Sequence, residues 1–203
     1  MNLNLIKRLS PFRIRRKIQK RINDIYLHWL KKQFAHFGKD SFVSHIRNLT
    51  GAEYISVGDN VRFGQYCVLE AFALHKNPEI TIGDNSLVGD FCHLGSIDYI
   101  HIGKNVIIGR FVLINDHSHG SSEDRFSDIP PLQRKLFSKG GITIGDNVWI
   151  GDKVSILSGV NIGKGAIVGT NSVVTKDIPS YAIAAGCPAR IIQDGDSNSH
   201  TEL

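Results

Sequence analysis

Apolar residues recur along this chain with a period of six. From residue 144 to residue 179 the sequence divides into the hexads IGDNVW, IGDKVS, ILSGVN, IGKGAI, VGTNSV and VTKDIP. The fifth position of each hexad is apolar or small. A fixed repeat of this kind sets the architecture before any single helix or strand is assigned. The first position of each hexad is Ile or Val, at Ile144, Ile150, Ile156, Ile162, Val168 and Val174.

The hexad has a direct physical interpretation. Positions one and five face the same way when a short extended run ends in a tight turn and restarts six residues later. The turns carry GDN, GDK, GKG and GTN, which tolerate unusual backbone angles. Three runs close a triangular coil, and successive coils stack as parallel strands at roughly 4.8 Å. One coil cannot bury its apolar face alone, so the sequence predicts a mainly β protein, a parallel β-helix of several coils.

The same positions can be followed back toward the N-terminus. Some spacings exceed six residues, so loops or bulges are expected at those corners. Cys67 and Cys92 occupy fifth positions and are expected one above the other inside the coils. We expect each of these sets to form one coil: Phe37, Val43 and Leu49; Val57, Phe63 and Leu69; Ile82, Val88 and Leu94; Ile102, Ile108 and Ile114.

The interruptions of the repeat define the organisation of the chain. We assign residues 1–36 to a basic amphipathic helical segment, 37–192 to the β-helix and 193–203 to a polar tail. The periodicity stops at one long extruded loop, residues 115–143, with no secondary structure expected in it. A loop of this length in a compact domain is usually functional.

Positive charge is concentrated at the N-terminus. Residues 1–32 hold ten of the 24 Lys and Arg and a single acid, a net charge of +9, whereas the remainder carries −4. Two interpretations of this segment stay open: it covers the end of the β-helix or a neighbouring subunit, or it lies on an anionic membrane. No base-reading or stacking motif accompanies the charge, so no nucleic-acid partner is expected. Its apolar stripe at helical spacing comprises Ile14, Ile18, Ile22, Ile25 and Trp29.

Composition indicates the compartment. The three cysteines are an odd number, which argues against a disulfide framework. The sequence holds no 18-residue apolar run and no signal-peptide core. We therefore expect a cytoplasmic protein, peripheral at the inner face of the membrane if the basic segment binds there.

The residues on either side of the loop resemble a known family. NDHSHG, then the loop, then ITIGDNVWIGDKVSILSGVNIGKGAIVGTNSVVTKDIPSYAIAAGCPARII, is similar to the hexapeptide-repeat acyltransferases. Over residues 57–192 the chain is most similar to the sugar O-acetyltransferases of bacterial polysaccharide loci. The resemblance implies a left-handed β-helix, a homotrimer, a saccharide acceptor, acetyl-CoA in the groove between subunits, and no metal.

The resemblance also implies a histidine general base at the corner before the loop. His117 fits, because an imidazole near its ordinary pKa can accept the proton of a sugar hydroxyl that attacks a thioester. His119 is the second candidate. Asp116 could fix the tautomer of the imidazole, although sequence neighbours in a turn often point apart. Asn115 is a candidate substrate ligand beside them.

Further site residues lie outside this corner. Trp149 occupies the sixth, outward-facing position of its hexad, which suits the wall of a ligand site or a subunit contact. By resemblance it lines the pantetheine or acyl end of the groove. Asn85, on a turn, resembles an acceptor-binding asparagine of related enzymes. Four residues match positions that contact coenzyme A in the family, with hydroxyls for the pantetheine and cations for the phosphates: Thr170, Thr175, Lys176 and Arg190.

Three functions stay open on this fold. The first is an acetyl-CoA-dependent O-acetyltransferase for a sugar hydroxyl of a bacterial surface polysaccharide or its precursor, and a sugar N-acetyltransferase would use the same base and groove. The second is a metal-dependent hydratase of the carbonic anhydrase type, in which histidines from neighbouring subunits would hold zinc and His93, His117 and His119 could supply ligands. However, H-x-H is not the spacing that this class resembles. The third is a non-catalytic scaffold with the loop as a binding surface.

Overall fold

The computed structural model describes residues 11, 14, 18 and 25–195, and the chain divides into two compact units, residues 1–33 and 34–203. In the first unit residues 25–31 are helical, as the sequence predicts. The described members of the predicted stripe are exposed, Trp29 by 66%, whereas Ile22 lies outside the described residues. No helix among the described residues is long and apolar enough to cross a membrane.

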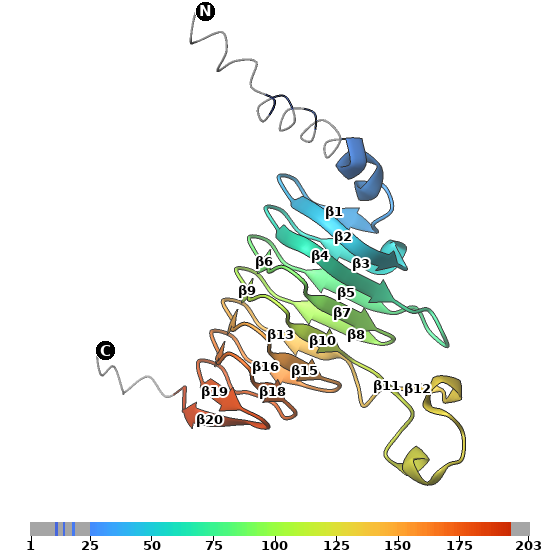
Figure 1. The fold of residues 1–203 in the computed structure, drawn as a ribbon. Coiled ribbons are helices and arrows are strands. Elements are labelled where there is room, and N and C mark those ends of the chain that lie inside the picture. The colour runs from blue at the N-terminus through green and yellow to red at the C-terminus, as the bar shows by residue number, and fades with distance from the viewer. Residues whose placement is uncertain (1–10, 12–13, 15–17, 19–24, 196–203) are drawn as a thin grey trace, which may run out of the picture. The chain divides into compact units, whose positions relative to one another are not determined.

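The second unit is the predicted parallel β-helix, with coils that stack in chain order from β1 to β19 (Figure 1). Each coil contributes to three faces, here named A, B and C. Face A is a six-stranded sheet of β1 (His36–Phe37), β3 (Ile55–Val57), β5 (Glu79–Ile82), β8 (Tyr99–Ile102), β13 (Ile142–Ile144) and β16 (Asn161–Ile162). The short turn η1 (Ala52–Tyr54) leads into β3.

Two long strands, β2 (Phe42–Thr50) and β4 (Arg62–Ala71), bend around a corner, so their first residues lie in face B and their last in face C. Face B continues with β6 (Leu87–Val88), β9 (Ile107–Ile108), β14 (Trp149–Ile150), β17 (Ile167–Val168) and β19 (Ile183–Gly186). Face C continues with β7 (His93–Ser96), β10 (Leu113–Asn115), β15 (Ser155–Leu157) and β18 (Val173–Val174).

The predicted register is confirmed on all three faces. From the second coil onward, the side chains at the first hexad position on each face are at most 3% exposed. Each buried Ile, Leu or Val contributes roughly 1.5–3 kcal/mol to folding, relative to the same side chain left exposed. The Cα partners run Phe37–Val57–Ile82–Ile102–Ile144–Ile162 on face A, Val43–Phe63–Val88–Ile108–Ile150–Val168 on face B, and Leu49–Leu69–Leu94–Ile114–Ile156–Val174 on face C.

The two interior thiols lie on adjacent coils, as predicted. Cys67 and Cys92 are both fully buried, and their sulfurs lie 3.3 Å from the carbonyl oxygen of Gly89 and 3.1 Å from that of Gly109. Burial raises the pKa of Cys67 from 9.0 to about 11 and that of Cys92 to about 12. Both therefore behave as small core residues.

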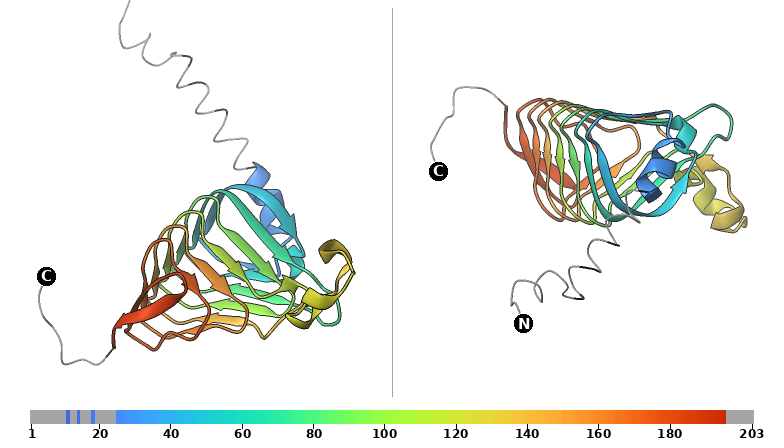
Figure 2. Two further views of the ribbon diagram at one scale, coloured as in Figure 1. Left: turned by 60° about the horizontal axis from the view of Figure 1, so that its bottom comes forward. Right: turned by 90° about the horizontal axis from the view of Figure 1, so that it is seen from above.

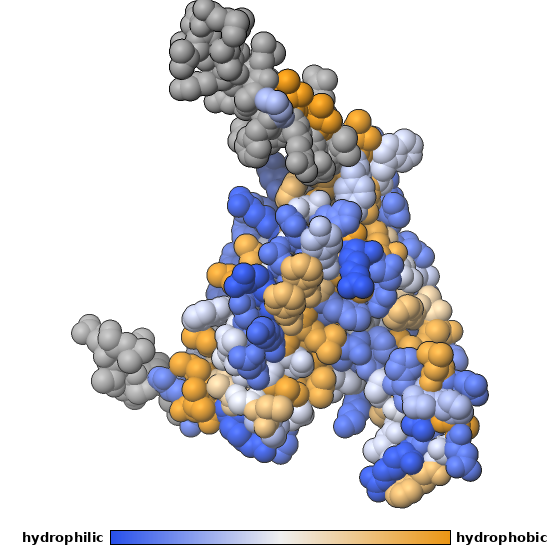
Figure 3. Space-filling view, viewed as in Figure 1, coloured by the Kyte–Doolittle hydropathy of each residue, from blue (hydrophilic) through white to orange (hydrophobic). Residues whose placement is uncertain are grey.

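The three corners differ in chemistry. At the A–B corner successive coils turn through Asn60, Asn85, Asn105 and Asn147, all with positive φ. At the B–C corner Tyr66, Phe91 and Phe111 have positive φ, and their rings stack with centroids 5.3 and 4.9 Å apart. Figure 3 shows that hydrophobic residues reach the surface over the coils and on the extruded loop.

The C–A corner carries the extrusions (Figure 2). The long one comprises residues 116–141, shorter than the predicted 115–143 because Asn115 still pairs in β10 and Ile142 and Thr143 already pair in β13. It is also not without structure. Its base is an antiparallel pair, β11 (Ser118–His119) and β12 (Leu136–Phe137), and two 3₁₀ turns lie between these strands, η2 (Glu123–Phe126) and η3 (Pro131–Gln133). A shorter loop, residues 72–78, leaves the same corner.

The C-terminal end is closed by a hairpin. Ile178 bridges to Ile162 and so begins one more coil. After β19 the chain reverses into β20 (Ala189–Gln193), which pairs antiparallel with it. The predicted tail begins inside this hairpin, because Gln193 is its last residue, and residues 196–203 lie outside the described residues.

Candidate active site

A buried carboxylate lies at the C–A corner where the chain leaves the prism. Strand β10 ends at Asn115, and the next side chain, Asp116, turns inward and is fully buried. It accepts hydrogen bonds from Ser96 Oγ at 2.6 Å and from the backbone N–H groups of Ile97 and Asp98, both at 2.9 Å. These donors all belong to the preceding coil, so the stacking of two coils creates the carboxylate site.

His117 is held by that carboxylate. Its Nδ1 lies 3.2 Å from Asp116 Oδ1, and its side chain is 11% exposed. A carboxylate only accepts hydrogen bonds, so Nδ1 carries the hydrogen and Nε2 is left with a free lone pair. The ring of Phe72 meets the imidazole edge-on, with centroids 5.8 Å apart. The imidazole is therefore fixed in both orientation and tautomer, as a general base requires.

Asn115 braces the same turn. Its Nδ2 donates a hydrogen bond of 2.8 Å to the backbone oxygen of His117. Its Oδ1 is the buried side-chain oxygen or nitrogen that has no hydrogen-bond partner among the described residues. A buried acceptor without a donor costs free energy, so this oxygen is available to a donor from another molecule.

A cavity of about 260 Å³ opens beside His117. Its lining includes Asn115, His117, Lys139, Leu157 and Thr175. Leu157 pairs directly with Asn115 in the next coil, so the cavity extends from His117 toward the C-terminal coils. It combines an imidazole, a hydroxyl, a cation and an apolar wall.

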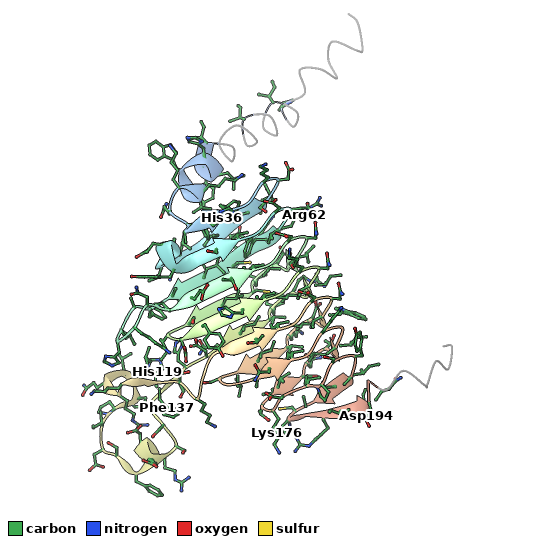
Figure 4. The ribbon with its side chains drawn as sticks, turned by 180° about the vertical axis from the view of Figure 1, so that it is seen from behind. His36, Arg62, His119, Phe137, Lys176 and Asp194 are labelled. Atoms are coloured by element: carbon green, nitrogen blue, oxygen red, sulfur yellow. The ribbon has the colours of Figure 1, made fainter. Side chains whose placement is uncertain are left out.

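A second cavity of about 230 Å³ joins two of the predicted coenzyme A residues. Lys176 and Arg190 both line it, one before and one after the last coil. Figure 4 shows Lys176 among the C-terminal coils and His119 with Phe137 at the base of the extruded loop. Within one chain these cations therefore form a group separate from the His117 cavity, although Thr175, next to Lys176, lines that cavity.

The remaining predicted site residues lie elsewhere in the single chain. His119 is an exposed residue of the hairpin at the base of the loop, paired with Leu136. Trp149 is 55% exposed on face B, so the prediction of an outward-facing side chain is confirmed. Thr170 lies at the B–C corner, beside Gly151. Asn85 lies at the A–B corner, where its Oδ1 accepts a hydrogen bond from Asn60.

The three candidate metal-ligand histidines are not grouped together within one chain. Among the described residues, no three or more His, Cys, Asp or Glu side chains are grouped so that they could hold a metal ion. His93, His117 and His119 therefore do not make the ligand set that a hydratase would need from a single subunit. His93 instead lies 2.9 Å from Glu70, through Nε2 and Oε2.

Sequence reasoning missed the residues that position His117. Ser96 binds Asp116, and Gly95 lets the neighbouring side chains approach, since a Cβ there would lie 2.5 Å from Asn115 Oδ1. The signal was present in the register, because Gly95 is one coil from Asn115 at the same position. Lys139 and Leu157 were missed because their approach to His117 depends on how the extruded loop rejoins the coils.

Comparison with known proteins gives consistent results. The family model "Bacterial transferase hexapeptide (six repeats)" matches residues 141–176. The chain is 40% identical over 156 residues to WbbJ of Escherichia coli (strain K12), provisionally named a lipopolysaccharide biosynthesis O-acetyl transferase; the match covers 75% of this chain and 76% of WbbJ. It is 32% identical over 178 residues to the galactoside O-acetyltransferase of the same organism, covering 84% of this chain and 70% of that protein.

A solved structure extends the likeness. The N-acyltransferase AntD from Bacillus cereus, in complex with dTDP and 3-hydroxybutyryl-CoA, superposes with a TM-score of 0.68 at 25% identity. The superposition covers 83% of this chain and 87% of AntD. The likeness therefore includes most of both chains and not the repeat region alone.

Proposed function

The chain belongs to the hexapeptide-repeat acyltransferases, and from this premise we propose that it is an acetyl-CoA-dependent O-acetyltransferase with His117 as the general base. Its acceptor is a sugar hydroxyl of a bacterial surface polysaccharide or of its precursor. The two curated relatives, both named as O-acetyl transferases, support the reaction, and the name of WbbJ supports the polysaccharide context.

The contact between Asp116 and His117 carries the proposal. Acetyl-CoA supplies an acetyl group activated as a thioester. Nε2 of His117 takes the proton of the acceptor hydroxyl while that oxygen becomes bonded to the acyl carbon, and the imidazolium returns the proton to the departing sulfur. Asp116, saturated with hydrogen bonds from the preceding coil, holds the ring and stabilises its transient positive charge.

The residues on the C-terminal side of His117 fit the acyl donor. The orphaned Asn115 Oδ1 can accept an amide N–H of the pantetheine arm, and Thr175 offers a hydroxyl in the same cavity. Lys139 of this cavity, with Lys176 and Arg190 of the second one, can pair with phosphates. These residues give a run of donors and cations toward the C-terminal coils.

A second copy of the chain completes the groove. Trp149 lies on face B and His117 lies at the C–A corner of the same chain. A ligand that contacts both kinds of residue would therefore lie between two subunits. Face B supports such a contact, because it presents an outward apolar column that a monomer leaves exposed. Its members are Leu87, Ile107 and Trp149, which pair in register and are between 43% and 55% exposed. Closed rings such as trimers are the usual result of one patch meeting a different patch.

Mixing two inactive variants tests the shared site. His117→Ala and Trp149→Ala would each be inactive as homotrimers. Random trimers from equal amounts of both would restore about one quarter of the wild-type sites, namely those that pair an intact His117 with an intact Trp149. The measurement is thioester consumption after co-refolding, with separately refolded variants mixed only at assay as the control. Unrestored activity despite mixed trimers would remove Trp149 from the shared groove.

The nature of the acceptor atom is tested by the product. Hydrolysis of the purified product in mild alkali releases acetate from an O-acetyl ester and leaves an amide intact. The likeness to AntD, an N-acyltransferase, keeps the sugar amine as the second acceptor. An alkali-stable product from an amino sugar, with no transfer to the matched neutral sugar, would move the assignment to the N-acetyltransferase.

The N-terminal segment supports a peripheral contact with an anionic surface. Its net charge of +9 over residues 1–32 accompanies exposed apolar side chains, Ile25 and Trp29 among them. We expect salt-sensitive sedimentation with phosphatidylglycerol vesicles and none with phosphatidylcholine vesicles. A variant lacking residues 1–32 is the control, and equal sedimentation of both proteins would exclude the membrane interpretation.

A further inference from the structure

An imidazole–carboxylate pair lies one coil before the general base. His93 Nε2 is 2.9 Å from Glu70 Oε2, and Asn48 Nδ2 donates a hydrogen bond of 2.6 Å to Glu70 Oε1. The side chain of Glu70 is 19% exposed and that of His93 42%. Three polar side chains from three successive coils of face C therefore meet at the surface, and the catalytic machinery described above uses none of them.

This pair adjoins His117 because residue 95 has no side chain. The Cβ position that Gly95 lacks lies 3.5 Å from His93 Nε2 and 3.3 Å from His117 Cε1. Both imidazoles thus approach one point, and Glu70 is bonded to the first of them. Gly95 also pairs directly with Glu70 in the preceding strand. Glu70, His93 and His117 are therefore spatial neighbours in that order, with His93 in the middle.

The two sides of His117 differ in the charge of their side chains. The C-terminal side carries cations, with Lys139 in the cavity and Lys176 and Arg190 beyond it. The N-terminal side presents the carboxylate of Glu70. A polyphosphate donor is attracted to the cations and repelled by the carboxylate, so the side with Glu70 suits a neutral partner.

We infer that Glu70 and His93 form the acceptor subsite, which recognises a neutral polyhydroxylated ring through hydroxyls next to the one that is acetylated. This inference rests on the proposed transferase function. An ionised carboxylate can accept up to four hydrogen bonds, and Asn48 and His93 supply two, so Glu70 can accept a hydroxyl hydrogen as well. The exposed edge of His93 offers a second polar contact, and Phe72 beside His117 gives an apolar wall for the C–H face of a sugar.

A similar pair on face A shows that the chemistry alone does not make a subsite. His101 Nε2 lies 3.1 Å from Glu79 Oε2, and Glu79 is 57% exposed. Among the described residues, no hydrogen bond, ion pair or ring contact joins this pair to His117, and the rings of Tyr99 and His101 stack with centroids 4.6 Å apart. Glu79→Gln is therefore the matched control for Glu70→Gln: each removes one charge from a carboxylate that pairs with a histidine.

The test is steady-state kinetics of the full chain with acetyl-CoA and methyl β-D-galactopyranoside. Glu70→Gln should raise the acceptor KM about 10- to 100-fold, the range for a lost hydrogen bond to a charged group. The KM for acetyl-CoA and the slow hydrolysis of acetyl-CoA without acceptor should stay within about twofold of the wild type. Glu79→Gln should change none of them. His93→Asn, at the more exposed partner, serves if Glu70→Gln fails to fold.

The outcomes separate the subsite from the reaction. An unchanged acceptor KM in Glu70→Gln, or a raised KM for acetyl-CoA instead, would overturn the subsite and leave the transferase standing. If the wild type transfers no acetyl group, the proposed function fails, and binding of the galactoside by saturation-transfer NMR then decides the subsite. If the wild type binds the galactoside and Glu70→Gln does not, the subsite is supported. If both proteins bind it equally, or if the wild type binds neither the galactoside nor the matched glucoside, the subsite is overturned.

Discussion

The A–B and C–A corners are built from the same repeat but differ in structure: the first is regular and the second is interrupted by loops. At the A–B corner each coil turns through a left-handed residue whose N–H bonds to the coil before, as from Asn105 to Asp84 and from Asn147 to Lys104, both at 2.9 Å. The asparagine side chains bond to one another as well, Asn105 Nδ2 to Asn147 Oδ1 at 3.1 Å. Nothing is inserted there.

The C–A corner is interrupted. Two loops leave it, residues 72–78 and 116–141, and it holds an acceptor without a donor, Asn115 Oδ1. Here the carboxylate of Asp116 contacts the imidazole of His117, and Asn115 Oδ1 has no hydrogen-bond partner among the described residues. We therefore expect substitutions at the unbroken corner to change stability and substitutions at the broken corner to change activity, a separation that mutation can test.

The largest expected effect is the loss of the base. His117→Ala should lower kcat/KM about 10²- to 10⁴-fold, and its cost in unfolding free energy should be no more than about 1–3 kcal/mol, from the lost contact with Asp116. Thioester consumption and differential scanning calorimetry measure the two quantities. His119→Ala is the control and should keep wild-type turnover; a loss there as large as in His117→Ala would make His119 the base.

Asp116→Asn should affect both properties, because this residue belongs to the core and to the site. An amide NH₂ in place of a carboxylate oxygen meets a hydrogen-bond donor, which should cost about 1–3 kcal/mol of unfolding free energy. Turnover should fall about 10²- to 10⁴-fold because the tautomer of His117 is no longer fixed. Urea unfolding and kinetics report the two. Ser96→Ala removes one of the four hydrogen bonds and should give smaller losses of both kinds.

At the unbroken corner the effect should fall on stability alone. Asn105→Ala keeps the Cβ in the left-handed region but loses the side-chain amide that makes this conformation tolerable, which should cost about 1–2 kcal/mol of unfolding free energy. Asn105→Gly accepts the same φ and should cost less. Both should keep full turnover. A drop in activity of the Ala variant at a temperature where it is fully folded would contradict the separation of the two corners.

The smallest effects concern the interior that the corners share. The raised pKa values of Cys67 and Cys92 mean that the folded state keeps its thiol protons while the unfolded state loses them above pH 9. The free energy of unfolding is therefore unaffected by these thiols below pH 9, and it declines as pH rises toward 11 because the unfolded state gains stability by losing its thiol protons. A thiol reagent at pH 8 should label the exposed Cys187 in the native protein and all three cysteines after denaturation; Cys187→Ser should remove the native signal.

The hexad register was readable from sequence because its cause is local. A residue such as Ile156 must point inward, and its partners six and eighteen positions away follow from the fixed length of a coil. The candidate base His117 came from the family resemblance of NDHSHG and the hexads after it, and its role stays a prediction. The bounds of the loop were misjudged by a few residues, because pairing of Asn115 and Ile142 depends on neighbouring coils.

The tertiary structure decided what surrounds the base. Ser96 and Asp116 are 20 positions apart, and their contact arises only when one coil stacks on the next. The same stacking brings His93 and His117 to Gly95, and the returning loop brings Lys139 to the cavity. The chain alone thus fixed the repeat and the interior, because both follow from short-range spacing, and the family resemblance pointed to His117 as the candidate base. Its partners were fixed by stacking distance and loop path, which no local pattern encodes.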